Sequence, residues 1–281
     1  MNVIPRVACI NDISGFGRCS LTTAISILSA AGVQACPVPT AVLSKHTGFS
    51  SFTFRDLTED MTKYLDTWND IPIDAVYSGF LGSSKQIDIV SDFIIKRRKT
   101  APDVCVIIDP VMGDAGRLYP TYTNEMKMCM KELVSHADII TPNLTEACFL
   151  TETEYCGEDV EDSFAERLAQ RLAEIGCNKI VLTGIRHGES MVNLTWDNGK
   201  VSIDEIHRLG VVFSGTGDIF ASVVCAFTAK GHSLFRCVDA AGSFISDVIE
   251  HTLRLRSPVK DGVVFEPLLS EINKYIDAAE K

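Results

Sequence analysis

The sequence contains no apolar run of the roughly 20 residues that a membrane-spanning helix needs. Its first fifteen residues lack a basic region followed by a long apolar core, so we expect no signal peptide. The ten cysteines form no C-x-x-C pair and show no regular spacing, and most have apolar neighbours. We therefore expect mostly buried thiols in a reducing cytoplasm.

An excess of positive charge is also lacking, since the formal net charge is -11 and the pI is about 5.0. An acidic surface repels phosphate backbones, so we expect no nucleic-acid partner. Small phosphate ligands stay possible, because a few backbone N–H groups can bind a phosphate locally. Of the 281 residues, 46% are hydrophobic and 22% charged, which excludes disorder of the whole chain.

Several catalytic motifs are absent. No G-x-x-x-x-G-K-[ST] P-loop occurs, the histidines form no H-E-x-x-H pair that would indicate zinc, and no G-x-S-x-G hydrolase elbow is present. Gly15 and Gly17 follow a strand pattern, as in a dinucleotide fold. However, no Asp or Glu occurs between Asp12 and Asp56, whereas that fold needs an acid about 20 residues on.

Short β-branched runs alternate with longer helical patterns. We expect strands at Val7–Ile10, Val38–Leu43, Ala75–Ser78, Val104–Ile108, Asp138–Thr141 and Lys179–Thr183, and a hairpin of Met191–Trp196 with Val201–Glu205. We expect helices at Ser20–Ala31 (with Ser20 as N-cap), Asp56–Trp68, Lys85–Lys99, near Glu146–Leu150, and at Ser163–Ile175, Ile219–Ala229, Val238–Leu253 and Phe265–Ala278. This alternation predicts an α/β fold with a mostly parallel sheet covered by helices on both faces. No linker divides the chain, so we expect one domain over residues 1–281.

Polar and glycine-rich clusters follow three of the predicted strands, at Asn11–Gly17, Asp109–Gly116 and Thr141–Glu146. Ligands of parallel sheets bind at the carboxyl ends of the strands. The coincidence predicts an enzyme whose site lies at that edge of the sheet.

The segment Phe213–Ser222 places Gly215, Thr216 and Gly217 before an apolar helix. Glycines let the backbone approach a ligand closely, and a helix N-terminus offers free N–H groups and a positive dipole end. This arrangement suits the charge that develops on a transferring phosphoryl group. Asp218 is either a helix cap or a base that accepts the proton of an attacking hydroxyl.

Two further segments carry candidate ligands of a metal ion. Asp109 and Asp114 could interact with magnesium directly or through water, or could form only a turn. Asn143 and Glu146 could coordinate water on a metal–triphosphate, or could form a capping box. Either segment alone leaves both interpretations open.

Taken together, six segments resemble the pyridoxal kinases of the ribokinase superfamily over nearly the whole chain. They are INDISGFGR at the start, LSKHTGF at Leu43–Phe49, YSGFLGS at Tyr77–Ser83, DPVMGD at Asp109–Asp114, TPNLTEA at Thr141–Ala147 and SGTGD at Ser214–Asp218. The last is typical of the superfamily. DPVMGD with TPN-x-x-E-A narrows the resemblance to pyridoxal and hydroxymethylpyrimidine kinases, and His46-Thr47 with GFLGS favours the pyridoxal kinases.

The resemblance implies a ribokinase-like three-layer α/β/α sandwich, with flaps at Leu43–Phe54 and Asp109–Tyr122 that close over the site. It implies ATP-dependent phosphorylation of the 5′-hydroxymethyl group of a B6 vitamer (pyridoxal, pyridoxamine or pyridoxine), in the salvage of vitamin B6 to pyridoxal 5′-phosphate. It also implies a homodimer.

The resemblance further implies the roles of site residues. Asp218 would be the catalytic base, and the N–H groups of Gly215, Thr216 and Gly217 the anion hole. The vitamer would be held by Asp218 together with Asp12, His46, Thr47 and Phe80. The ATP side, with Mg²⁺ and a monovalent cation such as K⁺, would be lined by Asp109, Thr141, Asn143, Glu146, Thr183, Gly184, Thr216 and Gly217. The cations would be held by Asp109, Thr141 and Glu146, partly through water.

The sequence departs from the pyridoxal kinases at three positions, since Asp12 replaces a common Ser, Lys45 an Asn and Phe80 a frequent Tyr. An acid at position 12 could pair with a protonated ring nitrogen or a substrate amine, so the preferred vitamer stays open. Two alternatives remain: a hydroxymethylpyrimidine (phosphate) kinase of thiamine synthesis, and an inactive regulator that binds a vitamer or nucleotide. Asp218 beside an intact Gly-Thr-Gly element argues against the regulator.

Overall fold

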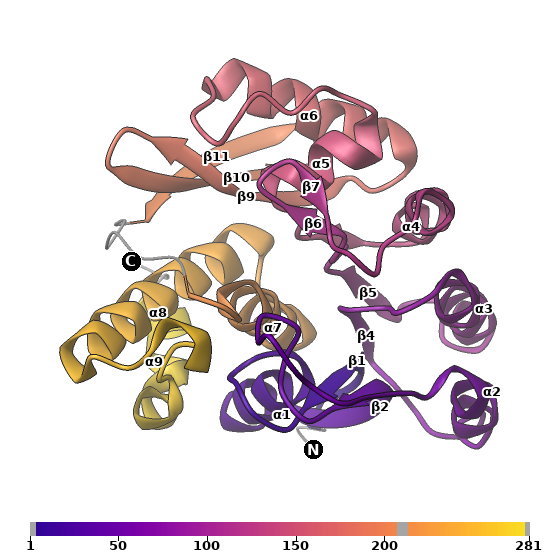
Figure 1. Ribbon diagram of the computed structural model, residues 1–281. Helices are drawn as coiled ribbons and strands as arrows, with labels where there is room; N and C mark the ends of the chain where they lie inside the picture. Colours follow the sequence, from indigo (N-terminus) through magenta and orange to yellow (C-terminus); the bar gives the residue numbers. More distant parts are fainter. Residues whose placement is uncertain (1–3, 207–212, 279–281) are drawn as a thin grey trace.

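The computed structural model describes residues 4–206 and 213–278, and in this part of the chain nine strands form one central sheet (Figure 1). In spatial order the strands are β11 (Lys200–Ile206), β10 (Ser190–Asp197), β9 (Lys179–His187), β8 (Ile139–Ile140), β5 (Cys105–Ile108), β4 (Ala75–Ser78), β1 (Arg6–Ser14), β2 (Gln34–Leu43) and β3 (Phe54–Asp56). The six strands from β9 to β2 are parallel, and β3, β10 and β11 are antiparallel to their neighbours. The predicted mostly parallel sheet is confirmed.

Helices cover both faces of this sheet. One layer holds α2 (Thr58–Asp66), α3 (Ser84–Thr100), α4 (Asn124–Ser135), α5 (Leu144–Thr151) and α6 (Asp162–Ile175). The other holds α1 (Ser20–Ala30), α7 (Thr216–Ala229), α8 (Leu234–Leu255) and α9 (Ile272–Ala278). Figure 1 shows α2, α3 and α4 on one side of the strands and α1, α7 and α8 on the other. The predicted α/β/α sandwich is therefore confirmed.

Strand β5 is apolar along its whole length because both of its faces are covered. On β5, Val106 and Ile108 enter the core under α2–α6, while Ile107 enters the core under α1, α7 and α8. Successive side chains of a strand point to opposite faces, so a strand buried on both faces shows a continuous apolar run. Such a strand ends where its first polar residue reaches the edge of the sheet, here at Asp109.

Two helical regions differ from the predictions. Helix α4 was not predicted, although Met126, Met130, Leu133 and Val134 form its buried stripe. The predicted C-terminal helix over Phe265–Ala278 is correct only in its second half. Glu266–Glu271 forms a 3₁₀ helix with a proline in its first turn, and α9 begins at Ile272.

The start of α1 also differs from the prediction. Cys19 occupies the cap position, no side chain caps the helix, and Ser20 is the first helical residue. Its φ of 54° lies in the left-handed region, which is uncommon for a residue with a side chain. Ser20 as N-cap is therefore wrong, and its hydroxyl is directed elsewhere.

Both predicted flaps are present at the carboxyl ends of the strands. In the first flap, Asp109–Tyr122, β6 (Gly113–Asp114) pairs with β7 (Arg117–Leu118) across a tight turn in which Ala115 and Gly116 have positive φ. The second flap, Leu43–Phe54, connects β2 to β3. It is closed by the Ser44 N–H, which donates to the Thr53 carbonyl at 3.1 Å.

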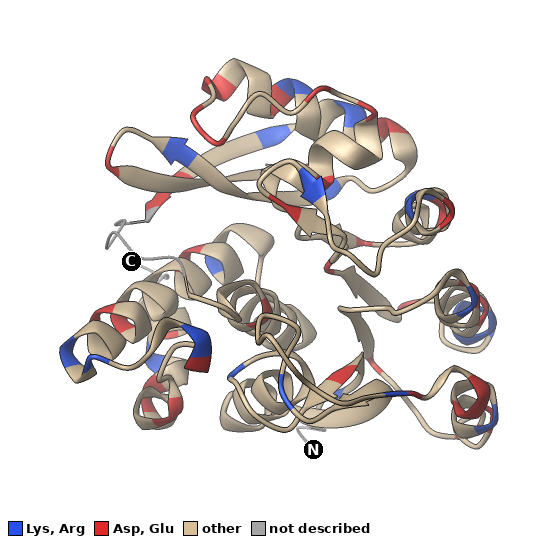
Figure 2. Ribbon diagram, in the orientation of Figure 1, with Lys and Arg blue, Asp and Glu red and all other residues tan. Residues whose placement is uncertain are grey.

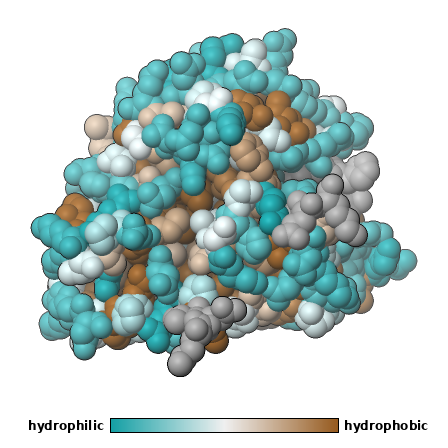
Figure 3. All heavy atoms as spheres, turned by 180° about the vertical axis from the view of Figure 1, so that it is seen from behind, coloured by the Kyte–Doolittle hydropathy of each residue, from teal (hydrophilic) through white to brown (hydrophobic). Residues whose placement is uncertain are grey.

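Charged residues of both signs lie along the outer helices, as Figure 2 shows. Figure 3 shows a predominantly hydrophilic surface on the opposite side, with hydrophobic residues in smaller groups. None of the helices in residues 4–206 and 213–278 combines the length and the apolar character that crossing a bilayer requires.

Candidate active site

The sheet changes its direction of growth at β1, which pairs with β2 on one side and with β4 on the other. At such a switch point the connections leave opposite faces of the sheet, and ligands bind in the crevice at the strand ends. Asn11 joins the elements that meet there. Its Oδ1 accepts the N–H groups of Asp12 at 2.9 Å and Phe80 at 3.0 Å, and its Nδ2 donates to Asp218 Oδ1 at 3.4 Å.

Helix α7 begins at this crevice. Gly215 is its N-cap with φ 83°, and a Cβ added there would lie 1.9 Å from the Arg18 carbonyl oxygen, so only glycine fits. Gly217 is exposed, and nothing lies within 4 Å of its Cβ position. The first N–H groups of a helix have no intrahelical acceptor. The Gly215–Gly217 segment therefore presents donors next to Asp218.

Asp218 is the third residue of α7 and does not cap it. Its partly buried carboxylate accepts the Asn11 amide of β1 at 3.4 Å, and the backbone N–H of Ser20, the first residue of α1, lowers its pKa. The pKa of Asp218 is raised to about 6, mainly by burial and also by the nearby Asp12, while the Ser20 N–H and the Asn11 amide lower it. The interpretation of Asp218 as a helix cap is therefore wrong, and a carboxylate that titrates near neutral pH suits a general base.

Four carboxyl groups lie in a row along the strand ends: Asp12, Asp218, Asp109 and Glu146. Each acid raises the pKa of the next one in this row. Asp12 raises the pKa of Asp218, Asp218 raises the pKa of Asp109, and Asp109 raises the pKa of Glu146. Burial is the main cause throughout, and it brings the pKa of Asp109 to about 8 and that of Glu146 well above its usual range. Buried acids beside one another favour a bound cation.

Asp109 and its neighbours come from adjacent strands. The Thr141 hydroxyl, after β8, donates to Asp109 Oδ1 at 2.9 Å, and the Thr183 N–H of β9 donates to the Pro142 carbonyl at 3.0 Å. Gly184 follows with φ 74°. Within residues 4–206 and 213–278, no three His, Cys, Asp or Glu side chains form a metal-binding group.

Asn143 and Glu146 form the capping box of α5. The Asn143 side chain accepts the Glu146 N–H, and Glu146 Oε2 accepts the Asn143 N–H, both at 2.9 Å. Both side chains also hold the first flap, since Asn143 Nδ2 donates to the Gly113 carbonyl at 2.9 Å and Glu146 Oε1 accepts the Met112 N–H at 3.1 Å. Asp114 is exposed and accepts only a local N–H, from Ala115 at 2.8 Å. Its interpretation as a turn residue is thereby supported.

Of the residues predicted to hold the vitamer, Asp12 and Phe80 lie at the other end of the acidic row, where both bind Asn11. Asp12 is only 5% exposed, and its Oδ2 accepts the Ser14 hydroxyl at 2.9 Å. Burial raises its pKa. Phe80 is half-buried at the end of β4, and Thr47 is exposed on the second flap. The N–H groups of Asp12 and Phe80 share the Asn11 Oδ1 acceptor, so the acid and the aromatic residue lie close together, whereas a place of Thr47 beside them stays a prediction.

His46 is buried, and both of its ring nitrogens have protein partners. Nδ1 accepts the Gly48 N–H at 3.1 Å, and Nε2 lies 2.8 Å from the Lys260 carbonyl, to which it donates. Its ring meets Phe49 edge-on at 4.7 Å. These contacts anchor the second flap to the segment around Lys260. A direct role of His46 toward the vitamer stays a prediction.

Sequence reasoning did not single out Asn11, Ser14 or Ser20 as site residues. Asn11 and Ser14 are 1% exposed and Ser20 is 7% exposed. One local signal could have identified Asn11, since it is the polar residue that directly follows the apolar strand Val7–Ile10. The partners of Ser20 depend on how α1 and α7 meet.

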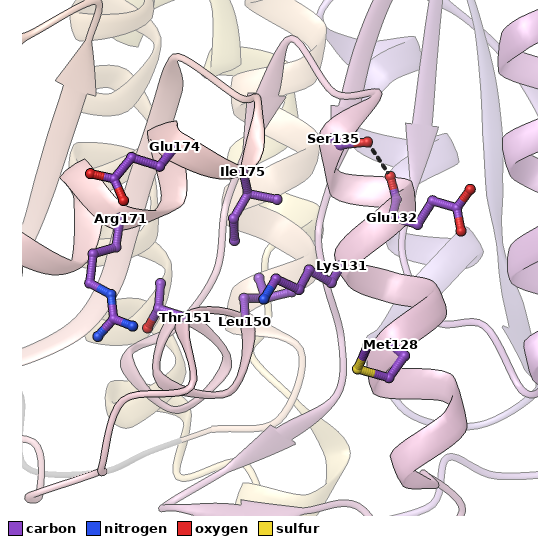
Figure 4. Close-up of a pocket in the computed structure, with 9 residues that line it drawn as sticks. All are labelled: Met128, Lys131, Glu132, Ser135, Leu150, Thr151, Arg171, Glu174 and Ile175. Carbon is purple, nitrogen blue, oxygen red and sulfur yellow. Dashed lines mark hydrogen bonds between the residues drawn. The ribbon is translucent and has the colours of Figure 1, made fainter.

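A cavity of about 590 Å³ lies elsewhere, between α4, α5 and α6 (Figure 4). Its lining residues are Met128, Lys131, Glu132, Ser135, Leu150, Thr151, Arg171, Glu174 and Ile175. Lys131 Nζ lies 2.8 Å from the Glu152 carboxylate, and Arg171 donates to the Thr153 hydroxyl at 2.6 Å. The cavity contains none of the predicted site residues, so it is separate from the site at the strand ends.

Known proteins resemble the chain in both sequence and fold. A protein of Bacteroides thetaiotaomicron described as a phosphomethylpyrimidine kinase is 36% identical, with a TM-score of 0.93 over 97% of this chain and 95% of that one. A crystal form of that protein with pyridoxal gives a TM-score of 0.91, with 96% of each chain covered. The pyridoxal kinase of Arabidopsis thaliana is 26% identical over 88% of this chain and 82% of its own.

A relative with the second predicted specificity is also similar. The hydroxymethylpyrimidine/phosphomethylpyrimidine kinase of Haemophilus influenzae is 28% identical over 66% of this chain and 69% of its own. Together these similarities confirm the predicted resemblance to pyridoxal kinases of the ribokinase superfamily. Residues 21–261 match the family described as phosphomethylpyrimidine kinase, and the chain belongs to that family of kinases.

Proposed function

We propose that this chain transfers the γ-phosphoryl group of ATP to the 5′-hydroxymethyl group of a B6 vitamer. The observation that carries the proposal is the position of the Asp218 carboxylate beside the backbone donors of Gly215–Gly217. The 36%-identical structure that contains pyridoxal supports the choice of substrate. An acid–base group next to an anion hole is what phosphoryl transfer to a hydroxyl requires.

In the proposed reaction, Asp218 accepts the proton of the vitamer hydroxyl. The oxygen forms a bond to the γ-phosphorus as the bond from that phosphorus to the bridging oxygen breaks, and ADP leaves with the bond electrons. The N–H groups of Gly215–Gly217 stabilise the charge on the transferring group. Asp12 pairs with a protonated ring nitrogen or amine, while Phe80 and Thr47 contact the ring.

The residues of the ATP side fit a cation and a triphosphate. Burial and the neighbouring Asp218 raise the pKa of Asp109, and no cationic side chain of the protein contributes to lowering it, so a bound cation would stabilise the carboxylate. Mg²⁺ and a monovalent cation such as K⁺ would be held by Asp109, Thr141 and Glu146, partly through water. When bound, these ions offset the charge of the triphosphate. Asn143, Thr183, Gly184 and Thr216 line the ATP side, and the flaps exclude water from it.

A substrate panel tests the proposal. We would measure ADP formation with pyridoxal, pyridoxamine, pyridoxine and hydroxymethylpyrimidine, in ATP, MgCl₂ and KCl, with Asp218→Asn as the inactive control. Turnover of a B6 vitamer, abolished in the control, is expected. Turnover of the pyrimidine alone would favour the second candidate, which the matching family and the Haemophilus relative support. Calorimetric binding without turnover would favour a regulator.

The substitution Asp12→Ser tests the proposed contact to the vitamer. If Asp12 pairs with an amine or a ring proton, the preference should move towards pyridoxal, which carries an aldehyde in place of the amine. The measurement is the ratio of kcat/KM values for pyridoxamine and pyridoxal in each enzyme. Unchanged ratios would assign Asp12 to the fold alone.

We also propose that one kinase domain, residues 1–281, acts as a cytoplasmic homodimer. Val42, Phe52 and Phe54 lie at the edge of the sheet with exposed fractions of 39–45%, and burying apolar surface drives association. All ten cysteines lie in the described residues and are free, which suits a reducing compartment. Light scattering should give a dimer mass that Phe54→Glu reduces, whereas Met128→Glu, exposed on α4, should not. A monomeric wild type would contradict the dimer.

A further inference from the structure

A segment near the C-terminus contacts two parts of the candidate active site at once. It runs from the 3₁₀ turn Val259–Asp261 to Glu266, the first residue of the next 3₁₀ helix, and we call it the 259–266 segment. Val263 and Phe265 are 0% and 4% exposed, so they fix the segment to the core under α1, α7 and α8. None of the motifs that predicted the site includes this segment.

Arg18, at the end of the first glycine loop, is bound to this segment through its backbone and its side chain. Its N–H donates to the Asp261 carbonyl at 3.2 Å, and its Nη1 donates to the same carbonyl at 3.3 Å. Its Nε forms an ion pair with Glu266 Oε1 at 2.6 Å. A Cβ added to Gly262 would lie 2.9 Å from the Arg18 Cβ, so the two chain segments are in close contact.

The carbonyl of Arg18 faces the start of α7. A Cβ added to Gly215 would lie 1.9 Å from this oxygen, so the Arg18 peptide and the N-cap of α7 pack directly on each other. The 259–266 segment therefore holds Arg18 on one side while α7 packs on the other. The position of the backbone donors at Gly215–Gly217 depends on where the segment holds Arg18.

The same segment holds the second flap through His46. The ring Nε2 donates to the Lys260 carbonyl at 2.8 Å, and this carbonyl is next to the one that binds Arg18. The ring Nδ1 accepts the Gly48 N–H at 3.1 Å, which joins the flap backbone to the segment. A Cβ added to Gly17 would lie 2.2 Å from His46 Cδ2, so the ring also packs against the residue before Arg18.

We propose that Arg18 is a positioning residue that couples the place of the second flap over the vitamer to the place of the anion hole at Gly215–Gly217. The 259–266 segment carries the coupling, because its adjacent Lys260 and Asp261 carbonyls bind the flap and Arg18. The inference rests on the proposed function. Arg18 acts through this segment and touches no reacting atom.

The substitution Arg18→Met tests the coupling, since it removes the Nε and Nη1 donors and keeps the backbone N–H. It should raise KM for the vitamer and lower kcat, each by about 2–30-fold, the range found for residues that couple two sites. Glu266→Ala breaks the same ion pair from the other side and should act in the same direction. Both variants should keep Tm within about 4 °C of the wild type, because an exposed ion pair contributes little stability.

Arg98→Met is a matched control. Arg98 lies on α3 and its Nη2 is 2.9 Å from Asp138 Oδ2. The side chains of this pair are 33% and 45% exposed, against 29% and 51% for Arg18 and Glu266. Neither Arg98 nor Asp138 belongs to the 259–266 segment, so the control should leave KM and kcat unchanged.

Two substitutions of His46 separate coupling through the segment from a local loosening of the fold. Asn carries Oδ1 on Cγ, where His carries Nδ1, so His46→Asn can keep the Gly48 bond and loses the Lys260 bond. Gln carries its amide nitrogen one atom further out, so His46→Gln can keep the Lys260 bond. Arg18→Met should raise KM for the vitamer in the His46→Gln background as in the wild type, but less than about twofold in the His46→Asn background, where the flap is already detached.

An Arg18→Met variant with the KM and kcat of Arg98→Met, or with the same effect on KM in both His46 backgrounds, would overturn the coupling while vitamer turnover by the wild type upheld the proposed function. A wild type that neither turns over nor binds any B6 vitamer would overturn both.

Discussion

Replacing Gly215 by alanine tests whether the backbone at the start of α7 has to lie where the structure puts it. The added Cβ would meet the Arg18 carbonyl oxygen at 1.9 Å, so the two segments would have to separate by about 1.1 Å to reach the 3.0 Å below which real Cβ contacts essentially never occur. The φ of 83° adds the penalty of a left-handed residue, about 1–2 kcal/mol. The carbonyl is backbone and cannot rotate away.

Two other glycines provide matched controls. Gly231 has φ 87° with nothing within 4 Å of its Cβ position, so Gly231→Ala carries only the conformational penalty of about 1–2 kcal/mol. Since 1 kcal/mol lowers Tm by about 2–4 °C in domains of about 150–250 residues, its Tm should fall by about 2–8 °C. Gly217→Ala has neither a clash nor a positive φ and should keep the Tm of the wild type.

The Gly215→Ala variant should lose more stability and also lose rate. Relief of the overlap typically costs about 1–3 kcal/mol beyond the penalty seen in Gly231→Ala. A displacement of about 1 Å at a reacting group can lower the rate about 10²-fold, so we expect that loss in kcat. The assays are thermal denaturation and steady-state ADP release. A Gly215→Ala variant with the Tm and kcat of Gly231→Ala would show that α7 does not need this backbone position.

Three further outcomes follow from the same geometry. Asp218→Asn should lower kcat about 10²–10⁴-fold with an unchanged Tm. In the wild type, kcat/KM should rise with pH through about 6, because the base is active only when it is deprotonated. A pH profile of kcat/KM that is flat from pH 5 to 7 would contradict this role. Because the pKa of Asp109 is raised to about 8 in the folded chain, the free energy of unfolding should fall as pH rises from about 4 to 8. MgCl₂ and KCl should therefore raise Tm more at pH 8 than at pH 5.5, and equal shifts would argue against a cation at Asp109. Asn143→Ala removes the cap of α5 and the hydrogen bond to the Gly113 carbonyl. It should lower the free energy of unfolding by about 1–2 kcal/mol in a denaturant titration and raise KM for ATP. An unchanged KM for ATP would mean that Asn143 serves only the fold.

The structure also explains why two predicted site residues have roles that the motifs alone do not reveal. The ring of His46 is held through both nitrogens by Gly48 and Lys260, so its contacts anchor a flap. Glu146 uses both carboxylate oxygens on backbone N–H groups of Asn143 and Met112. A family motif reports that a residue type is needed at a position, but it does not report which neighbour needs it.

The layers of the fold and the edge of the sheet at which the site lies could be predicted from the order of the residues alone. Apolar runs bounded by polar residues reveal buried strands because burial imposes that pattern locally, and Asp109 and Thr141 could be placed at strand ends for this reason. Asp218 with its glycines was likewise identifiable, since the whole element lies within a few residues. Helix α4 is an exception, since it was not predicted although methionines and aliphatic residues form its buried stripe.

Which of these residues meet depends on how the strands and helices pack in three dimensions. Asn11 and Asp218 are 207 positions apart, and their contact exists because α7 packs beside the end of β1. Ser20 follows the usual pattern of a helix cap, yet it is the first residue of α1 and has a left-handed backbone, while Cys19 takes the cap position. Local patterns report burial and propensity, whereas the pairing of donors with acceptors depends on the order of strands and the packing of helices, which no short segment encodes.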